Sequence, residues 1–243
     1  MNEVLTIAES TWGRILRMKV VYFLILCALV IIGGTHNYEV LSMGEHRALM
    51  VDVSLMLNTV AAFLAILAIT FEISKELKDG MASTMLTKPL GRTQYLIGKC
   101  VGSALAGMVI TSLIACGYAF IYNLFFQEHI SAAMIQGHLL IVLSVIPMSS
   151  LAVLMAVFVS ETFSALATAI IIWFTHSSSA LSSVKLIYGG VIPDFNLFNL
   201  KAQAVYTTAI NWDYISMVLF WGVAFSAFAL ALASLAFSMK DLK

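Results

Sequence analysis

Long stretches without a charged side chain alternate along this chain with short polar segments. Five such stretches cover residues 53–71, 100–127, 129–160, 162–184 and 214–239. Each can supply the roughly 20 apolar residues that a helix needs to cross a bilayer. A sixth, residues 20–38, has a shorter apolar core that can lengthen if Arg17 and Lys19 extend their charged ends to the interface. The pattern predicts an all-α integral membrane protein with six transmembrane helices in a single domain.

The residues before the shortest apolar stretch predict a helix of a different kind. Apolar side chains recur there at spacings compatible with a helix in the membrane interface: Val4, Ile7, Trp12, Ile15 and Leu16. The stretch that follows ends in GGTHNY, which lacks the Ala-x-Ala-like cleavage site of a signal peptide. We therefore expect residues 1–19 to form an interfacial helix and residues 20–38 to be retained as a membrane anchor.

Composition supports a membrane protein and argues against nucleic acid as a partner. Of the 243 residues, 61% are hydrophobic and 11% are charged, whereas soluble domains carry roughly 25% charged residues. The formal net charge is +0, and the sequence has no basic run of the kind that binds nucleic acid. Membrane lipid and other proteins are the partners that we expect.

The distribution of lysine and arginine predicts the orientation of the chain, because these residues concentrate in cytoplasmic segments. With a cytoplasmic N-terminus, only Arg47, Lys185 and Lys201 fall outside. All others fall inside: Arg14, Arg17, Lys19, Lys75, Lys78, Lys88, Arg92, Lys99, Lys240 and Lys243. We therefore expect both termini in the cytoplasm. This orientation makes residues 72–98 a cytoplasmic segment and residues 185–213 the largest external loop.

The cytoplasmic segment contains the polar sequence KDGMASTMLTKPLGRTQYLIGK at residues 78–99. Gly80 permits a backbone break after the second span, and the residues after it predict about two helical turns. Met81, Met85 and Leu86 fall on one side of these turns, as an apolar stripe that is too small for a core and suits a socket on a partner protein. Pro89 ends the turns. The segment therefore predicts a short surface helix held between two membrane helices.

Arg92, Tyr95 and Lys99 follow this helix, where the third span enters the membrane. With the preceding residues they resemble the signature E-x3-G-T-x4-LL-x-x-P-x-(S/T)-R-x-x-Y-L-x-G-K of type-2 ATP-binding-cassette (ABC) permeases. Two positions depart from it, since Met81 replaces the usual Thr and Gly91 replaces the usual Ser or Thr. A second stretch, VIPDFNLFNLKAQAVY, is similar to P-(N/D)-F-x-x-F-(D/N) in an exporter-like branch of that family.

In that family this segment is the coupling helix, which docks on the nucleotide-binding subunit and carries ATP-driven movement into the membrane. The resemblance implies that eight residues couple this chain to the ABC ATP-binding subunit: Glu76, Gly80, Met85, Leu86, Pro89, Arg92, Tyr95 and Lys99. It also implies export of an unidentified substrate across the inner (plasma) membrane of a prokaryote. Six helices form half of the usual wall, so a second copy or a sibling permease is an implied partner.

A different role for the same machinery stays open. Some relatives in that family assist the maturation of a copper enzyme, and by that resemblance the chain is instead a non-transporting transmitter of the ATP cycle to an extracytoplasmic machine. A stable external partner without solute flux would distinguish this alternative from export.

The chain itself is not expected to be an enzyme. It has no GxxxxGK(S/T) phosphate loop, so the resemblance implies that ATP and Mg²⁺ bind the partner subunit and that this chain holds no cofactor. An intramembrane serine protease is disfavoured, because Ser177 beside His176 in sequence is not a nucleophile and base pair. The histidines fall in or near external segments on this topology, and without an HxxH or MxxM cluster we expect no metal site.

Polar and small residues within the apolar stretches complete the set of candidates. Asn58 and His176 are candidate pathway residues, because polar groups in a bilayer usually point away from lipid. Hydrogen bonding between helices is the interpretation that we favour for most such residues. Close approach of helices is predicted at Gly98, Gly102, Ala106, Gly222 and Ser226. For these positions we favour packing within one chain over a contact between two chains.

Overall fold

The computed structural model describes residues 2–37, 45–79, 91–177 and 193–239, and within these ranges it contains helices and no β-strand. The α-helices are α1 (Asn2–Leu16), α2 (Lys19–Gly34), α4 (His46–Lys78), α6 (Arg92–Phe126), α7 (Ala132–Phe158), α8 (Glu161–Ser177), α10 (Lys201–Val205) and α11 (Trp212–Ser238). Two 3₁₀ turns are η1 (Thr35–Asn37) and η3 (Phe195–Phe198). The predicted all-α class is thus confirmed for the described part of the chain.

In the described part of the chain, five helical segments are long and apolar enough to cross a membrane: Lys19–Asn37, His46–Lys78, Arg92–Phe126, Ala132–Phe158 and Trp212–Ser238. Each coincides with one of the predicted spans. The remaining predicted span, residues 162–184, corresponds to α8, which has 17 residues and a shorter apolar stretch, Phe163–His176. The chain is therefore a multi-pass membrane protein whose described residues form helices and no β-strand, and α8 as a sixth span remains a prediction.

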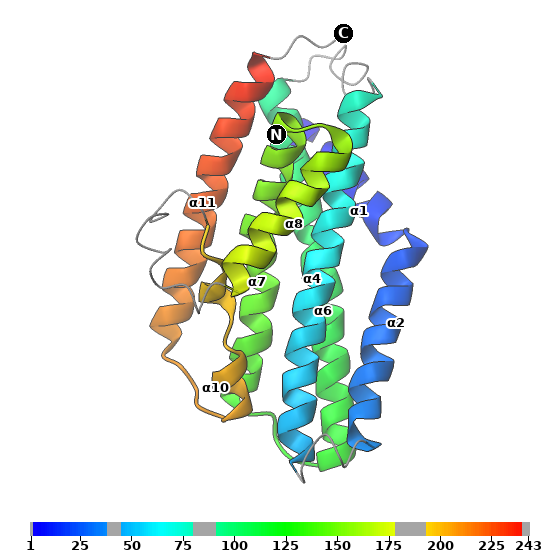
Figure 1. Ribbon diagram of the computed structural model, residues 1–243, viewed down its shortest axis with the longest axis vertical. Helices are drawn as coiled ribbons and strands as arrows, with labels where there is room; N and C mark the ends of the chain where they lie inside the picture. The colour runs from blue at the N-terminus through cyan, green and yellow to red at the C-terminus, as the bar shows by residue number, and fades with distance from the viewer. Residues whose placement is uncertain (1, 38–44, 80–90, 178–192, 240–243) are drawn as a thin grey trace.

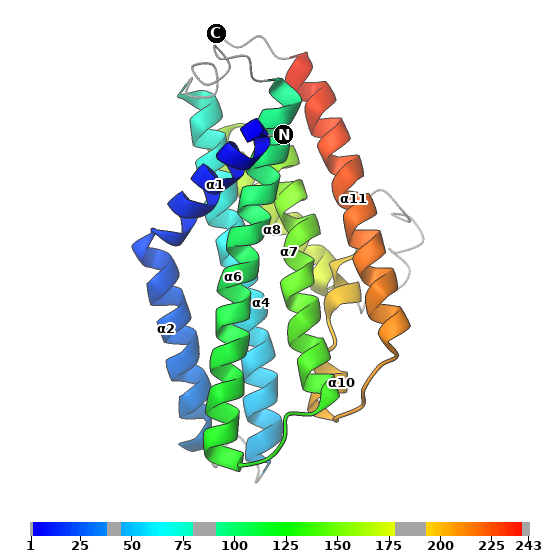
Figure 2. The same ribbon diagram turned by 180° about the vertical axis from the view of Figure 1, so that it is seen from behind.

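The helices form an elongated bundle in which α7 is the central element (Figures 1 and 2). Of the most apolar stretch of α7, 72% is buried inside the protein. The corresponding shares for α2 and α11, at the periphery, are only 22% and 28%. Helix α1 crosses the outer face of α6 (Figure 2). The first turns of α1 and α6 and the last turns of α4 and α11 lie at the same end of the bundle, which we call the N-terminal end.

Local capping explains where several of these helices begin and end. The Ser131 side chain accepts a hydrogen bond from the Met134 backbone N–H at the start of α7, and Asn211 accepts one from the Asp213 N–H at the start of α11. Gln127 closes α6 in the left-handed conformation, with φ of 50°. Two apolar stretches that are almost continuous in sequence are thereby separated into α6 and α7.

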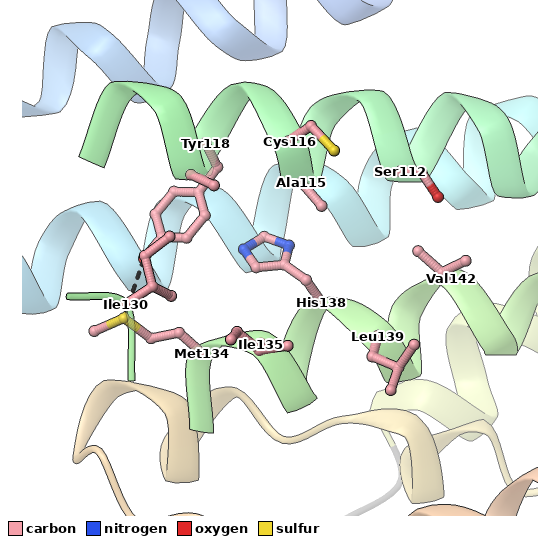
Figure 3. Close-up of a pocket in the computed structure, with 11 residues that line it drawn as sticks. Ser112, Ala115, Cys116, Tyr118, Ile130, Met134, Ile135, His138, Leu139 and Val142 are labelled. Atoms are coloured by element: carbon pink, nitrogen blue, oxygen red, sulfur yellow. Dashed lines mark hydrogen bonds between the residues drawn. The ribbon is translucent and has the colours of Figure 1, made fainter. Parts of the chain in front are cut away.

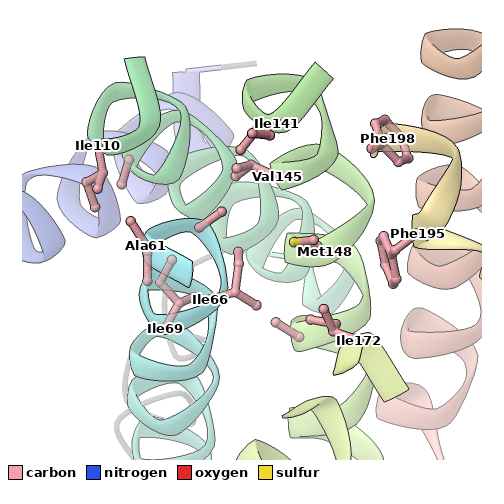
Figure 4. Close-up of a cluster of buried hydrophobic side chains, with 14 of the residues drawn as sticks. Ala61, Ile66, Ile69, Ile110, Ile141, Val145, Met148, Ile172, Phe195 and Phe198 are labelled. Carbon is pink, nitrogen blue, oxygen red and sulfur yellow. The ribbon is translucent and has the colours of Figure 1, made fainter. Parts of the chain in front are cut away.

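The core includes aliphatic side chains from α4, α6, α7 and α8, and two aromatic rings from η3 join it (Figure 4). Phe195 and Phe198 are 0% and 3% exposed and belong to the same buried cluster as Met148 of α7 and Ile172 of α8. The described part of the predicted external loop, residues 193–211, is therefore packed against the bundle instead of lying wholly outside it. Its PDFNLF sequence supplies the reason, since burial of its two phenylalanine rings is strongly favourable.

Glycines bring helices of this chain into close contact. A Cβ atom added at Gly98 would lie 2.7 Å from the Cβ of Ile7, and one added at Gly102 would lie 2.5 Å from the carbonyl oxygen of Ala8. Both neighbours belong to α1. At Gly222 of α11 an added Cβ would lie 3.3 Å from the Phe198 ring. The favoured interpretation of these glycines, packing within one chain, is confirmed.

Helix α1 confirms the predicted helix within residues 1–19. Its apolar face, with Ile7, Ala8 and Ile15, is buried, and it packs along α6. Leu5 lies on the opposite side and is 59% exposed. The location of α1 in a membrane interface stays a prediction.

Candidate functional site

A buried ion cluster lies at the N-terminal end of the bundle, where α4 ends and α6 begins. Glu76 of α4 is at its centre. One carboxylate oxygen, Oε2, accepts a hydrogen bond from the Tyr95 hydroxyl at 2.9 Å and lies 2.6 Å from the Nζ of Lys99. The side chains of Glu76 and Lys99 are each 3% exposed. Three residues that the sequence singled out are thus in direct contact.

Arg14 of α1 completes this cluster. Its Nη1 lies 2.5 Å from Oε1 of Glu76 and 3.1 Å from Oε1 of Glu72, one helical turn away on α4. Arg14 is 40% exposed, so the cluster extends from the interior to the surface. Two positive and two negative side chains therefore join α1, α4 and α6.

Helical spacing explains why these side chains meet. Glu72 and Glu76 are four residues apart on α4, and Tyr95 and Lys99 are four residues apart on α6, so each pair occupies one helix face. Desolvating charges is costly and is offset only by close pairing and additional hydrogen bonds. Glu76 has such additional partners in Arg14 and Tyr95.

Arg92 links α11 to the same end of the bundle. Its Nη1 donates hydrogen bonds to the carbonyl oxygens of Phe237 at 2.9 Å and of Ser238 at 3.0 Å. The last carbonyls of a helix lack partners within it and carry partial negative charge, so a guanidinium group stabilises them. The Tyr95 and Phe237 rings are stacked with their centres 6.2 Å apart. The ion cluster and the end of α11 are therefore in contact.

Of the eight residues predicted to couple the chain to an ATPase, the structure brings four to this end of the bundle: Glu76, Arg92, Tyr95 and Lys99. The other four lie outside the described residues: Gly80, Met85, Leu86 and Pro89. The role of these residues in coupling stays a prediction.

Sequence reasoning missed Arg14 and Glu72 as members of the ion cluster. The four-residue spacing of Glu72 and Glu76 was a partial signal, since it places both carboxylates on one face of α4. Arg14 is separated from Glu76 by 62 positions. A single sequence does not indicate which helix packs on that face.

A second polar cluster lies inside the bundle, between α4 and α7. The Asn58 Nδ2 lies 3.1 Å from Nδ1 of His138, and the Ser54 Oγ lies 3.4 Å from its Nε2. The Ser54 hydroxyl donates to the carbonyl oxygen of Val51 at 2.8 Å, which leaves its oxygen able to accept a hydrogen bond from the Nε2–H group. A neutral histidine with its proton on Nε2 satisfies all of these contacts.

His138 also lines a pocket of about 280 Å³ between α6 and α7 (Figure 3). The pocket wall is mostly apolar, and the Tyr118 ring lies on the imidazole with their centres 4.7 Å apart. Since Asn58 and Ser54 contact both ring nitrogens, the pocket offers little polar chemistry. Asn58 is fully buried and its side chain is hydrogen-bonded to His138 of the neighbouring helix α7. This agrees with the favoured interpretation that most polar residues in the apolar stretches form hydrogen bonds between helices.

His176, the other candidate pathway residue, lies near the end of α8 on the wall of a different cavity. This cavity has a volume of about 370 Å³ and is lined by residues of α4, α7, α8 and η3 and by residues 199–201. Asn58 does not line it. The two candidate pathway residues are therefore not brought together in the structure.

Within the ranges that the structure describes, no three His, Cys, Asp or Glu side chains group closely enough to hold a metal ion. No protein-family model matches this sequence, and no curated protein matches it.

Proposed function

We propose that this chain is the membrane-spanning permease subunit of an ABC transporter, which couples ATP hydrolysis by a separate subunit to export of a substrate. The proposal begins from the resemblance of residues 76–99 to the coupling segment of type-2 ABC permeases. The observation that carries it is the buried ion cluster, because Glu76, Tyr95 and Lys99 of that signature contact one another through a shared carboxylate.

Residues of the ion cluster lie on both sides of the proposed coupling segment, on α4 before it and on α6 after it. Helix α4 ends at Lys78, two residues after Glu76, and Arg92 is the first residue of α6. A force applied to the segment by an ATP-binding subunit would act on α4 and α6 together. The ion pair of Arg14 with Glu76 would transmit the force to α1, and the hydrogen bond of Arg92 to Phe237 would transmit it to α11. Closely packed interiors transmit displacement between helices because they contain few voids.

In this proposal α8 is the sixth span and both termini are cytoplasmic. The 17 residues of α8 fall at the lower limit of the range that crosses a bilayer, about 17–25 residues. The N-terminal end of the bundle faces the cytoplasm, in agreement with its richness in positive charge: Arg14, Lys75, Lys78, Arg92 and Lys99. Arg47 and Lys201 form ion pairs with Glu128 and Asp52 elsewhere in the bundle.

The proposed partners follow from what the chain lacks in sequence. It contains no phosphate loop, so ATP and Mg²⁺ bind the separate subunit. A second copy of the chain or a sibling permease provides the other half of the transporter. The proposed location is the inner (plasma) membrane of a prokaryote.

Site-specific photo-crosslinking tests the contact with the ATP-binding subunit. A photoreactive amino acid is introduced at Met85 and, as a control, at Tyr206, which is 77% exposed at the C-cap of α10. We expect a crosslink from Met85 to a protein that carries a phosphate loop, and none from Tyr206. If Met85 crosslinks to no ATP-binding protein, or both positions capture the same proteins, the proposal is wrong.

A further inference from the structure

The cavity that His176 lines lies beside the end of α8, where η3 and the non-helical residues 199–200 pack against the bundle. Helix α8 ends partway along α4 and α7, and η3 lies next to its end (Figure 1). On α4 the cavity is lined from Leu55 to Val60, which at 1.5 Å per residue places it about 14–21 Å from the start of that helix. Non-helical backbone at membrane depth is tolerated where it is buried in protein or lines a cavity. The residues after η3 meet this condition.

The walls of this cavity combine a large apolar surface with a few polar groups. Its volume of about 370 Å³ falls in the range of small-molecule sites, about 300–1,000 Å³. Leu55, Val60 and Ile141 provide apolar wall, whereas His176 and Lys201 provide polar groups. A site of this kind holds a hydrocarbon chain and orients it by a polar head.

Lys201 is a cation held in place at this cavity. Its Nζ lies 2.9 Å from Oδ1 of Asp52, and the Lys201 side chain is 38% exposed. Lys201 lines the cavity and Asp52 does not. A lysine ammonium group has three N–H donors, so the contact with Asp52 leaves two of them for a ligand. Asp52 therefore fixes the position of the Lys201 ammonium group, and a ligand in the cavity can reach that group.

We infer that this cavity binds an anionic amphiphile, whose carboxylate or phosphate head contacts Lys201 while its hydrocarbon tail lies along the apolar wall. A free fatty acid and a phospholipid share this chemistry. As a substrate site the inference rests on the proposed permease function, whereas as a binding site it stands without it. Charge-assisted hydrogen bonds to the head and apolar burial of the tail both contribute to binding.

Native mass spectrometry of the purified full-length chain tests the site. The chain is incubated with dodecanoate, dodecyl phosphate, dodecanol and butyrate, and bound molecules are counted. We expect one dodecanoate or dodecyl phosphate per chain, and at least about tenfold weaker binding of uncharged dodecanol, since a hydrogen bond to a charged group is lost. Butyrate, which has the head without the tail, should also bind at least about tenfold more weakly than dodecanoate, since it lacks eight methylene groups. Tighter binding of dodecyl phosphate than of dodecanoate assigns the ligand to phospholipid, and the reverse order assigns it to fatty acid.

Two pairs of variants separate ligand binding from structural damage. Lys201→Gln removes the cation and should weaken dodecanoate binding about tenfold or more. Asp52→Asn removes the counter-charge but keeps the cation and an amide oxygen that can still accept a hydrogen bond from it, so this variant should not weaken binding. Thr59→Phe places a ring in the cavity and should abolish binding, whereas Leu64→Phe, on an exposed part of α4 that does not line the cavity, should not.

Equal effects of Lys201→Gln and Asp52→Asn, or unchanged binding to both Lys201→Gln and Thr59→Phe, overturn the inference. The assay contains no ATP-binding subunit, so its outcome is independent of the proposed function. If the chain binds dodecanoate specifically but recruits no ATPase, the binding site is supported and the proposed permease function is wrong. If it recruits an ATPase but binds no dodecanoate, the permease function is supported and the binding site is wrong.

Discussion

Glu76 of α4 and Lys99 of α6 form a buried ion pair, with 2.6 Å between Oε2 and Nζ and only 3% of each side chain exposed. The two residues lie on either side of the segment that we propose to dock on an ATP-binding subunit. Because Arg14 and Tyr95 contact the same carboxylate, the pair is the centre of a contact between three helices.

Removal of one partner of this pair should destabilise the fold more than removal of both. Glu76→Gln leaves the Lys99 ammonium group buried without a counter-ion, which typically costs about 3–5 kcal/mol. The double variant Glu76→Gln with Lys99→Met removes both charges and should recover most of the lost free energy of unfolding. Thermal unfolding in detergent, followed by circular dichroism, measures this difference. Equal stability of the single and the double variant would contradict the prediction.

The docking of α1 on α6 should depend on Gly102. An added methyl group would lie 2.5 Å from the backbone oxygen of Ala8, so Gly102→Ala should lower the free energy of unfolding by about 1–3 kcal/mol through overpacking. Gly33→Ala is the matched control on α2, because a Cβ atom there meets nothing within 4 Å. This control should be neutral or stabilising, since alanine favours helix by up to about 1 kcal/mol over glycine. Unfolding curves that coincide for the two variants would count against close docking of α1.

Arg92 should protect the last turn of α11. Arg92→Ala removes hydrogen bonds from a charged group to the carbonyls of Phe237 and Ser238, each worth about 1.5–3 kcal/mol. Hydrogen exchange of the amides in residues 234–239 should accelerate about tenfold or more. The control is Arg47→Ala, whose exposed pair with Glu128 is worth about 0–1 kcal/mol and which should leave this exchange unchanged. Unaltered exchange in Arg92→Ala would rule out the capping role.

Asn58 and His138 should stabilise the bundle as a pair. His138→Leu leaves the fully buried Asn58 amide without its hydrogen-bond partner, at a cost of about 1–3 kcal/mol. Adding Asn58→Leu should restore part of the stability, because no unpaired amide then remains buried. A double-mutant cycle on unfolding free energies measures the coupling. Additive effects of the two substitutions would show that the observed contact contributes no coupling energy.

Five of the six predicted spans coincide with long apolar helices of the described part of the chain, because apolar length is a local property of the sequence. The helices nevertheless extend beyond the charge-free stretches. Helix α4 begins at His46 and ends at Lys78, although residues 53–71 are its uncharged part. It continues through Glu72 and Glu76 because both carboxylates form ion pairs with Arg14. A hydropathy pattern does not indicate such pairs.

The candidate site was predictable only where the signature is contiguous. Glu76, Tyr95 and Lys99 could be selected from one short segment of sequence. Their partner Arg14, like the pairing of Asn58 with a histidine 80 positions away, depends on which helices pack together. The contacts of His138 were likewise not predictable: it was expected in or near an external segment, and it lies in the second turn of α7, 6% exposed, with its ring nitrogens in contact with Ser54 and Asn58 of α4.

Affinity purification of this chain from its native membranes, with mass spectrometry and an ATPase assay on the eluate, tests the proposed coupling most directly. We predict that the wild-type chain recovers an ATP-binding subunit with ATPase activity. Glu76→Lys should insert in the membrane but lose both, because it reverses the charge between Arg14 and Lys99. The control Glu128→Lys, which alters an exposed ion pair outside the cluster, should retain both. Recovery of the intact wild-type chain without any ATPase would contradict the account.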